Sequence, residues 1–171
     1  MNYHDIKKCD MLNGDGIRVS LWISGCEHHC NQCQNPQTWD VNSGIPFDKL
    51  AEDELFEALS KEYVSGITLS GGDPLHENHL EDVLNIVNKI RILFGYDKTI
   101  WLYSGYTWNE VWEQENKLRK EIVSKCDVFV DGRYEEELRD ITLKWCGSTN
   151  QRVIDVQQSL KEHQVVLYEC C

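Results

Sequence analysis

The sequence lacks any long hydrophobic run. No apolar stretch among its 171 residues approaches the roughly 18–20 residues that a membrane-spanning helix needs. The N-terminus, MNYHDIKKCD, also lacks the apolar segment of a secretory signal peptide. We therefore expect a cytoplasmic protein that does not bind a membrane.

Proline is scarce and glycine is not enriched, with 3 and 11 residues respectively. No stretch is rich in proline, glycine or serine, and no internal repeat divides the chain. Hydrophobic residues make up 41% and charged residues 27%, which is typical of a globular protein rather than a disordered or collagen-like one. The length suits one hydrophobic core, so a single domain over residues 1–171 is predicted.

Positive charge is in deficit. The chain has 17 lysines and arginines against 29 aspartates and glutamates, a formal net charge of −12. A protein that binds the phosphate backbone needs clustered cations, so this balance argues against nucleic acid as a partner. An acidic surface suits a protein partner with a basic docking face.

Cysteine, in contrast, is abundant. The eight cysteines are Cys9, Cys26, Cys30, Cys33, Cys126, Cys146, Cys170 and Cys171. In a reducing compartment, clustered cysteines bind metal or carry out redox chemistry more often than they form disulfides. Cys126 begins an apolar segment and is expected to be a buried small hydrophobic side chain. Cys170 and Cys171 are adjacent and would point to opposite faces of a strand, which disfavours a shared metal.

Short strands and helices alternate along the chain. Residues 17–23 alternate apolar with polar side chains, whereas residues 80–87 place apolar side chains at the i, i+3, i+4 and i+7 positions of a helix. Strands are expected at 17–23, 67–69, 99–103, 127–130, 152–156 and 165–168, and helices at 48–60, 80–87 and 107–125. Asp48 is a candidate N-cap for the first helix.

This alternation predicts βαβ units with right-handed crossovers. The chain is shorter than the roughly 200–250 residues of a complete eightfold barrel. We therefore expect an α/β fold, a partial and open β/α barrel of about six mostly parallel strands. Ligands of such sheets bind beyond the carboxyl ends of the strands. Glycines that could let the backbone approach a ligand there are Gly25, Gly71, Gly72, Gly105 and Gly132.

Three cysteines form the clearest motif. Cys26, Cys30 and Cys33 have the spacing C-x3-C-x2-C directly after the first expected strand. Three thiolates within eight residues can converge on one metal centre if the chain wraps around it as a loop. Iron–sulfur clusters are usually held by four thiolates, so three would leave one iron open to a substrate or cofactor.

Two other interpretations of this motif remain open at this point. Zinc could be held by the three cysteines with His28 or His29 as a fourth ligand, in a structural site without catalysis. An electron-transfer iron–sulfur protein would need a fourth cysteine, which Cys9 or Cys146 would have to supply. Metal analysis separates zinc from iron, and cofactor cleavage separates an enzyme from a carrier.

The order of two motifs makes the sequence recognisable. The cysteine loop follows the first expected strand, and Ser70-Gly71-Gly72-Asp73-Pro74 follows the second. This combination resembles the radical S-adenosylmethionine superfamily, and more narrowly the activating proteins of anaerobic (class III) ribonucleotide reductases. The narrower resemblance is carried by residues 13–18, 24–26, 35–36, 38–39, 70–75, 104–106, 130–133 and 145–152. It covers the chain to about residue 157 and leaves 158–171 as an unassigned tail.

The resemblance implies that Cys26, Cys30 and Cys33 bind three irons of a [4Fe–4S] cluster, and that S-adenosylmethionine chelates the fourth. Reductive cleavage of S-adenosylmethionine would yield methionine and a 5′-deoxyadenosyl radical. By resemblance, this radical generates a glycyl radical on the large subunit of the anaerobic ribonucleotide reductase, with reduced flavodoxin or a similar protein as electron donor. No acid–base side chain is expected to be catalytic. The alternative within this class is an activase of another glycyl-radical enzyme, such as pyruvate formate-lyase.

The resemblance also implies the contacts with S-adenosylmethionine. They are expected at Gln32, Cys33, Gln34, Gly71, Gly72, Asp73, Ser104 and Asp131. The Gly71–Asp73 backbone would face the methionine amino group, and Ser104 and Asp131 would lie near the carboxylate and ribose. Gln34 departs from the family, which usually has an aromatic or large apolar residue there to pack near adenine. Arg18 is expected to be a structural ion-pair partner, and residues 145–152 to serve the fold and the partner surface.

Overall fold

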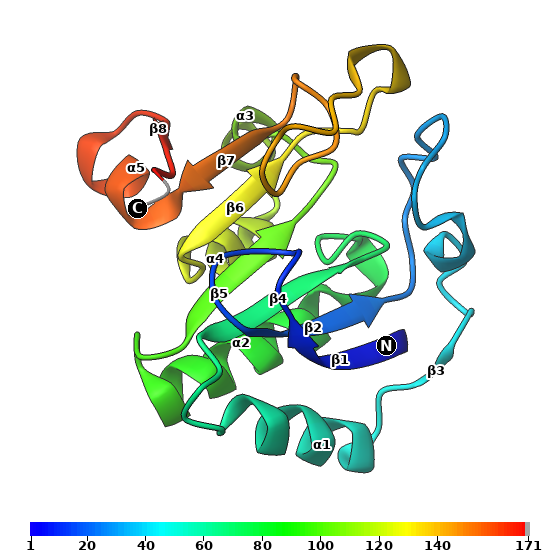
Figure 1. Ribbon diagram of the computed structural model, residues 1–171, viewed down its shortest axis with the longest axis vertical. Helices are drawn as coiled ribbons and strands as arrows, with labels where there is room; N and C mark the ends of the chain where they lie inside the picture. Colours follow the sequence, from blue (N-terminus) through cyan, green and yellow to red (C-terminus); the bar gives the residue numbers. More distant parts are fainter. Residues whose placement is uncertain (170–171) are drawn as a thin grey trace.

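An eight-stranded mixed sheet forms the centre of the molecule, in the order β3-β1-β2-β4-β5-β6-β7-β8 (Figure 1). The computed structural model describes residues 1–169. Its strands are β1 (Asn2–Asp10), β2 (Arg18–Ile23), β3 (Ile45–Pro46), β4 (Gly66–Gly71), β5 (Thr99–Tyr103), β6 (Val128–Asp131), β7 (Arg152–Asp155) and β8 (Val166–Leu167). Its α-helices are α1 (Lys49–Leu59), α2 (Leu80–Phe94), α3 (Trp108–Glu113), α4 (Lys117–Ser124) and α5 (Val156–Glu162). Short 3-10 helices occur at η1 (Pro36–Thr38), η2 (Glu77–His79) and η3 (Glu136–Leu138).

Parallel pairing is confined to the middle of the sheet. Strands β2, β4, β5 and β6 run parallel, whereas β1 and β3 at one edge and β7 and β8 at the other pair antiparallel. Over residues 1–169, β3 and β8 are separate edges, so the sheet is open and a barrel is not confirmed. The expectation of about six mostly parallel strands is therefore correct for the centre of the sheet and wrong for its edges.

Strand β1 was not predicted from the hydrophobic pattern, because its sequence is mainly polar. Only Tyr3, Ile6 and Asp10 of its nine residues are buried. Its register against β2 shifts between Tyr3 and Asp5 and again between Lys7 and Asp10. These irregularities interrupt the two-residue alternation from which a strand is predicted. Strand β3 has only two residues, too few to leave a pattern.

Helix boundaries follow from local capping. The Asp48 side chain accepts a hydrogen bond from the first turn of α1, as the sequence predicted. The single helix expected over residues 107–125 is instead two helices, because Gln114 is extended (ψ 147°) and the Asn116 side chain caps α4. Asp155 caps α5, in a region where the sequence indicated mainly strands. None of the described helices has the length and apolar character needed to span a bilayer.

Alternation along the central strands gives the sheet two different faces. In β5, Ile100 and Leu102 belong to the main hydrophobic core, which also contains the buried side chains of α1, α2 and α4. Trp101 and Tyr103 belong to a second cluster on the opposite face. There Trp145, from a loop, packs edge-on against Trp101 with ring centroids 4.8 Å apart. In Figure 1 helix α2 lies behind the sheet and α1 lies below it, and loops cross the face toward the viewer.

Arg18 is fully buried at the start of β2. The expected ion pair is wrong, since no described carboxylate pairs with this guanidinium. Arg18 instead donates five hydrogen bonds to neutral oxygen atoms of Asp15, Ile67, Thr68 and Thr99. Its role is structural, because these partners tie the loop before β2 to β4 and β5.

Candidate functional site

The cysteine segment forms a loop that leaves the carboxyl end of β2 and closes on itself. The Gly25 N–H donates to the carbonyl oxygen of Thr38 at 2.7 Å, and the Cys26 N–H donates to that of Trp39 at 3.0 Å. These two hydrogen bonds join the start of the loop to its end. The chain between them therefore wraps around a small volume, as the spacing of the cysteines requires.

The three cysteines line one cavity inside this wrap, which we name the cluster cavity. The Cys33 N–H donates to the Cys30 carbonyl oxygen at 3.1 Å, which closes a tight turn between them. His29 and Gln32 have left-handed backbone conformations, with φ 48° and 57°. Residues other than glycine seldom adopt this conformation. Two such residues in one loop therefore indicate a strained backbone that the surrounding structure holds in place. The bend brings Cys26, Cys30 and Cys33 to the same cavity wall.

The three cysteines form no disulfide, and burial favours the protonated thiol at Cys26 and Cys30. Burial raises the pKa of Cys26 to about 12, with a further contribution from the negative charge of Asp73. Burial also raises the pKa of Cys30, and the neighbouring Cys33 adds to this effect. Because only thiolates bind metal, metal binding at this site must release protons.

The donor set suits a cluster better than a single zinc ion. Within residues 1–169, no three histidine, cysteine or acidic side chains lie close enough to hold one metal ion. Both ring nitrogens of His28 are occupied, by Asp73 at 2.6 Å and Arg133 at 3.1 Å, and His29 is exposed with Nδ1 against the Glu27 carbonyl. A cluster places its thiolates around a larger body of iron and sulfide, so three thiols spread over one cavity wall fit it. Cys9 does not line this cavity, and neither does Cys146.

Glycines at the ends of β4 and β5 allow the cysteine loop to approach the sheet. Gly71 has φ +104°, and a Cβ on it would lie 2.6 Å from the Ile23 backbone nitrogen. A Cβ on Gly72 would lie 2.4 Å from the Gly25 carbonyl oxygen, at the start of the loop. A Cβ on Gly105 would lie 2.3 Å from the His28 ring. Gly72 and Gly105 thus allow the loop to pack against the strand ends, and Gly71 allows β4 to pack closely against β2.

The Gly72→Ala variant is expected to lose about 1–3 kcal/mol of unfolding free energy, the usual cost of overpacking. The added methyl group meets a backbone carbonyl that cannot rotate away, so the loop must shift. Urea unfolding of the metal-free protein measures the loss. An unchanged unfolding midpoint would show that the loop adapts without strain.

Asp73 is the hub that joins the loop to the sheet. Its carboxylate is buried and accepts hydrogen bonds from the Leu75 N–H (2.8 Å), the Ser104 hydroxyl (2.8 Å) and the Gly105 N–H (3.0 Å), beside its contact with His28. Burial alone would raise the pKa of Asp73, but the hydrogen bonds from His28, Leu75 and Ser104 outweigh it and hold that pKa below its usual range. The oxygen atoms of this carboxylate are therefore already used in hydrogen bonds within the protein.

Ser104 and Asp131 are similarly engaged. The Ser104 hydroxyl donates to Asp73 and accepts from the Tyr106 N–H at 3.1 Å. The buried Asp131 carboxylate pairs with both Nε and Nη2 of Arg152 and caps α3 through the Trp108 N–H at 2.7 Å. Both residues lie at strand ends, as predicted, but their polar atoms point into internal networks. Ser104 lines the cluster cavity and Asp131 does not.

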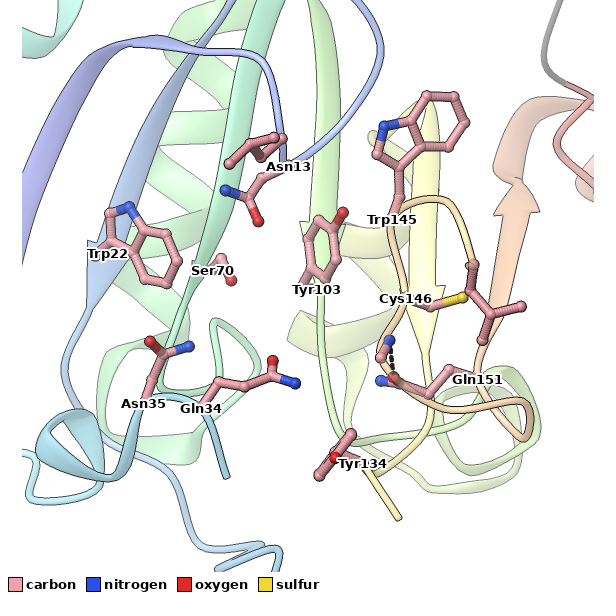
Figure 2. A pocket seen from close by; sticks show the side chains of 13 residues that line it. Asn13, Trp22, Gln34, Asn35, Ser70, Tyr103, Tyr134, Trp145, Cys146 and Gln151 are labelled. Carbon is pink, nitrogen blue, oxygen red and sulfur yellow. Dashed lines mark hydrogen bonds between the residues drawn. The ribbon is translucent and has the colours of Figure 1, made fainter. Parts of the chain in front are cut away.

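A larger cavity of about 370 Å³ adjoins the cluster cavity on the loop-covered face of the sheet (Figure 2). The two share the residues Gln34, Asn35, Ser70, Tyr103, Tyr134 and Gln151. Among the residues that the structure describes, no charged side chain lines the larger cavity. Trp22, Trp145 and Cys146 complete its wall, together with Asn13, Leu12, Leu143 and Gly147. Its chemistry is that of neutral hydrogen-bonding groups among aromatic rings.

Two polar side chains face this cavity without using their full hydrogen-bonding capacity inside the protein. The Tyr103 hydroxyl is buried and has no described partner, and burial raises the pKa of this phenol. The Gln34 side chain extends across the cavity toward Tyr134 and Gln151 (Figure 2). A polar amide therefore stands where an aromatic residue was expected from the resemblance. Gln34 is exposed and available to a ligand, whereas the Tyr103 hydroxyl is an unpartnered polar group enclosed behind the cavity wall.

The structure adds residues that the sequence did not single out. Arg133 and Tyr134 follow β6 and line the cluster cavity, and Gln151 reaches it from the loop before β7. Arg133 belongs to segment 130–133, which carried the resemblance, and Gln151 belongs to segment 145–152, which the sequence assigned to the fold and the partner surface. Gln32 is exposed and lines neither cavity. Cys126 is buried as predicted, while Cys170 and Cys171 lie outside the described residues.

Comparisons with known proteins agree with this geometry. Residues 12–154 match the family of 4Fe-4S single cluster domains. The anaerobic ribonucleoside-triphosphate reductase-activating protein of Escherichia coli K12 is 42% identical over 155 residues, which cover 90% of this chain and 97% of that protein. The protein of the same name from Enterobacteria phage T4 is 40% identical over 153 residues, covering 90% and 93%. That from Vibrio cholerae is 39% identical over 153 residues, covering 88% and 96%.

These matches include the cysteine loop, the glycine-rich strand ends and both cavities, and they extend over nearly the full length of each relative. The chain therefore belongs to the family of anaerobic ribonucleoside-triphosphate reductase-activating proteins, and its residues 12–154 form a 4Fe-4S single cluster domain.

Proposed function

We propose that this chain activates an anaerobic ribonucleoside-triphosphate reductase by generating a glycyl radical on its large subunit. The observation that carries the proposal is a closed loop whose three free thiols line one cavity at the glycine-rich ends of parallel strands. The relatives named as activating proteins of that reductase support it. In this proposal Cys26, Cys30 and Cys33 hold a [4Fe–4S] cluster, and S-adenosylmethionine binds beside it.

The cofactor pair supplies the chemistry. Cys26, Cys30 and Cys33 would hold the cluster, and the bound, reduced pair would supply one-electron reductive cleavage of S-adenosylmethionine to methionine and a species able to abstract hydrogen. The protein binds and orients the cofactors, and it excludes water from them. The closed loop presents three thiols to one cavity, and burial of Cys26 limits access of water to that wall. The parallel strands β2, β4, β5 and β6 act in this proposal as a partial β/α barrel whose carboxyl ends face the cofactors.

The charges of S-adenosylmethionine suggest which groups would meet them. Arg133 is the one permanently cationic side chain among the described residues that line the cluster cavity. Its hydrogen bond to His28 and its ion pair with Glu110 at 3.2 Å hold it at the rim. We place the methionine carboxylate near this guanidinium and the amino group near the Gly71–Gly72 backbone.

The remaining predicted contacts take more limited roles. Gln34 lies between the two cavities and would offer its amide to the adenosine portion. Asp73 and Ser104 would act through the positions of the strand ends, because their polar atoms are already bonded to each other. Gln32 and Asp131 lie off the cavity wall and would shape the turn and the end of β6.

The uncharged larger cavity suits the glycine-bearing segment of the partner. An extended peptide around glycine exposes backbone N–H and C=O groups and little charge, which matches a wall of amides, hydroxyls and aromatic rings. The wall is continuous with that of the cluster cavity, so such a segment could reach the cofactors. We place the reaction in the cytoplasm, with reduced flavodoxin or a similar one-electron donor.

Anaerobic reconstitution tests the proposal. The protein is loaded with iron and sulfide, reduced with dithionite and given S-adenosylmethionine, and 5′-deoxyadenosine is measured by chromatography. With the large reductase subunit present, electron paramagnetic resonance is expected to show a glycyl radical. A radical formed only on pyruvate formate-lyase would contradict the choice of partner. Zinc in place of iron, with no nucleoside formed, would contradict the whole proposal.

A further inference from the structure

His28 lies inside the cysteine loop, between Cys26 and Cys30, and is fixed from two sides. Its Nε2 lies 2.6 Å from the Asp73 carboxylate at the end of β4. Its Nδ1 lies 3.1 Å from Nε of Arg133, beyond the end of β6. The imidazole side chain is 4% exposed and its Asp73 partner 1% exposed. A single side chain thus connects the loop to two strand ends that are 45 and 105 residues away in sequence.

The arginine determines which way the imidazole hydrogen bonds run. A guanidinium can only donate, so Nδ1 of His28 accepts from Arg133. Nε2 then carries the ring proton and donates it to the Asp73 carboxylate. Each of the three groups therefore has a distinct part: Asp73 accepts, His28 donates and accepts, and Arg133 donates.

The space around the ring is as restrictive as its hydrogen bonds. A Cβ on Gly105 would lie 2.3 Å from the imidazole, so glycine at that position makes room for it. The Tyr106 ring meets the imidazole edge-on, with centroids 4.7 Å apart. The ring can hardly rotate in this slot. The cysteine loop, which carries this ring, is therefore held at a fixed distance from the end of β5.

We propose that His28 is a positioning residue, which fixes the cysteine loop to the buried Asp73 and holds Arg133 at the cavity rim before any cofactor binds. This inference rests on the proposed function, because it assigns the arrangement to cluster binding. His28 is not itself a ligand, since neither ring nitrogen is free. Its effect is to present Cys26 and Cys30 in the geometry that the cluster needs, as residues behind metal ligands do in other sites.

Three variants separate positioning from bulk stability. His28→Ala removes both hydrogen bonds, whereas His28→Gln keeps an N–H donor and a C=O acceptor on a side chain of similar reach. His29→Asn is the matched control, because the neighbouring histidine is exposed and asparagine tolerates its left-handed backbone. Each protein is reconstituted with iron and sulfide, and the half-life of its cluster is measured under a ferrous chelator. The metal-free proteins are then alkylated, and labelling at each cysteine is followed by mass spectrometry.

His28→Ala is expected to shorten the cluster half-life by about tenfold or more, in line with the 10–100-fold effect of removing supports behind metal ligands. Its metal-free Cys26 and Cys30 are expected to react faster than those of the unmodified chain. His28→Gln is expected to recover most of both properties, and His29→Asn to match the unmodified chain. Recovery by glutamine would exclude a general loss of folding as the cause.

Equal half-lives and equal alkylation rates for His28→Ala and the unmodified chain would overturn the inference and leave the proposed function standing. Failure of His28→Gln to improve on His28→Ala would also overturn it, because the donor–acceptor pattern would then be irrelevant. If the unmodified chain itself binds no cluster, the proposed function fails. The alkylation rates of the metal-free proteins would still report whether His28 holds the loop.

Discussion

The Cys30→Ala variant is expected to form no 5′-deoxyadenosine above the level of a reaction without protein. Cys30 occupies the middle of the closed loop, and its thiol shares a cavity wall with those of Cys26 and Cys33. With two thiols left, the proposed [4Fe–4S] cluster would lose a ligand on a second iron, and that iron would be exposed to exchange. The measurements are iron and sulfide per protein after reconstitution, followed by chromatography of the nucleoside.

Cys126→Ala is the matched control for this prediction. Its thiol is fully buried in the main core and donates a weak hydrogen bond to the Ile122 carbonyl at 3.3 Å. The substitution is expected to cost about 1 kcal/mol of unfolding free energy and to leave nucleoside formation intact. Normal nucleoside yield from Cys30→Ala would contradict the cluster assignment. Loss of activity in Cys126→Ala without loss of folding would show that thiol count, rather than position, controls the assay.

Elements with a strong local signal could be predicted from the sequence. Strand β5 occupies residues 99–103, as expected, because three consecutive buried residues stand between Gly95 and Gly105. The start of α1 could be predicted from Asp48, because the hydrogen bond of this N-cap involves only the first turn of the helix. The cysteine loop was also foreseen, since the spacing of its cysteines is local. Each of these features depends on residues close together in the chain.

Features that depend on distant partners could not be predicted. Asp73, Ser104 and Asp131 were placed correctly at strand ends, but a strand end does not reveal whether a carboxylate faces a ligand or a neighbour. His28 lies 45 residues from Asp73, and Arg152 lies 21 residues from Asp131. These pairings follow from the strand order, which the hydrophobic pattern did not fully reveal. The larger cavity has the same origin, because its wall is assembled from segments on both sides of the sheet centre.

The hydrogen bonds of the buried Arg18 form another such long-range network, which stabilises the fold. Its Nε donates to the Thr68 hydroxyl at 2.8 Å, and Nη2 donates to the carbonyl oxygens of Ile67 and Thr99 at 2.6 and 3.0 Å. Nη1 donates to the Asp15 carbonyl and the Thr99 hydroxyl, both at 3.0 Å. Burial lowers the pKa of Arg18 to about 10, which is still far above neutral pH, so the guanidinium stays charged. Five neutral oxygen atoms thus take the place of a counter-ion.

Arg18→Met is expected to cost about 4 kcal/mol of unfolding free energy, at the upper end of single substitutions. Methionine fills part of the volume but leaves buried oxygen atoms of Thr68, Ile67 and Thr99 without donors, and each such group costs about 1–3 kcal/mol. Arg18→Lys is expected to lose nearly as much, because an ammonium group has three donors in place of five and no planar fork. Urea unfolding of the metal-free protein measures both variants.

The control is Arg139→Met, because Arg139 is exposed and its loss is expected to change the unfolding free energy by no more than about 0.5 kcal/mol. A similarly small change for Arg18→Met would show that water reaches the abandoned oxygen atoms. Arg18 lies at the start of β2 and the cysteine loop leaves that strand's other end. A destabilised Arg18→Lys protein that still folds at low temperature is therefore expected to retain its cluster. Loss of the cluster in that folded variant would mean that the two ends of β2 are coupled, and that the sheet itself transmits strain to the thiols.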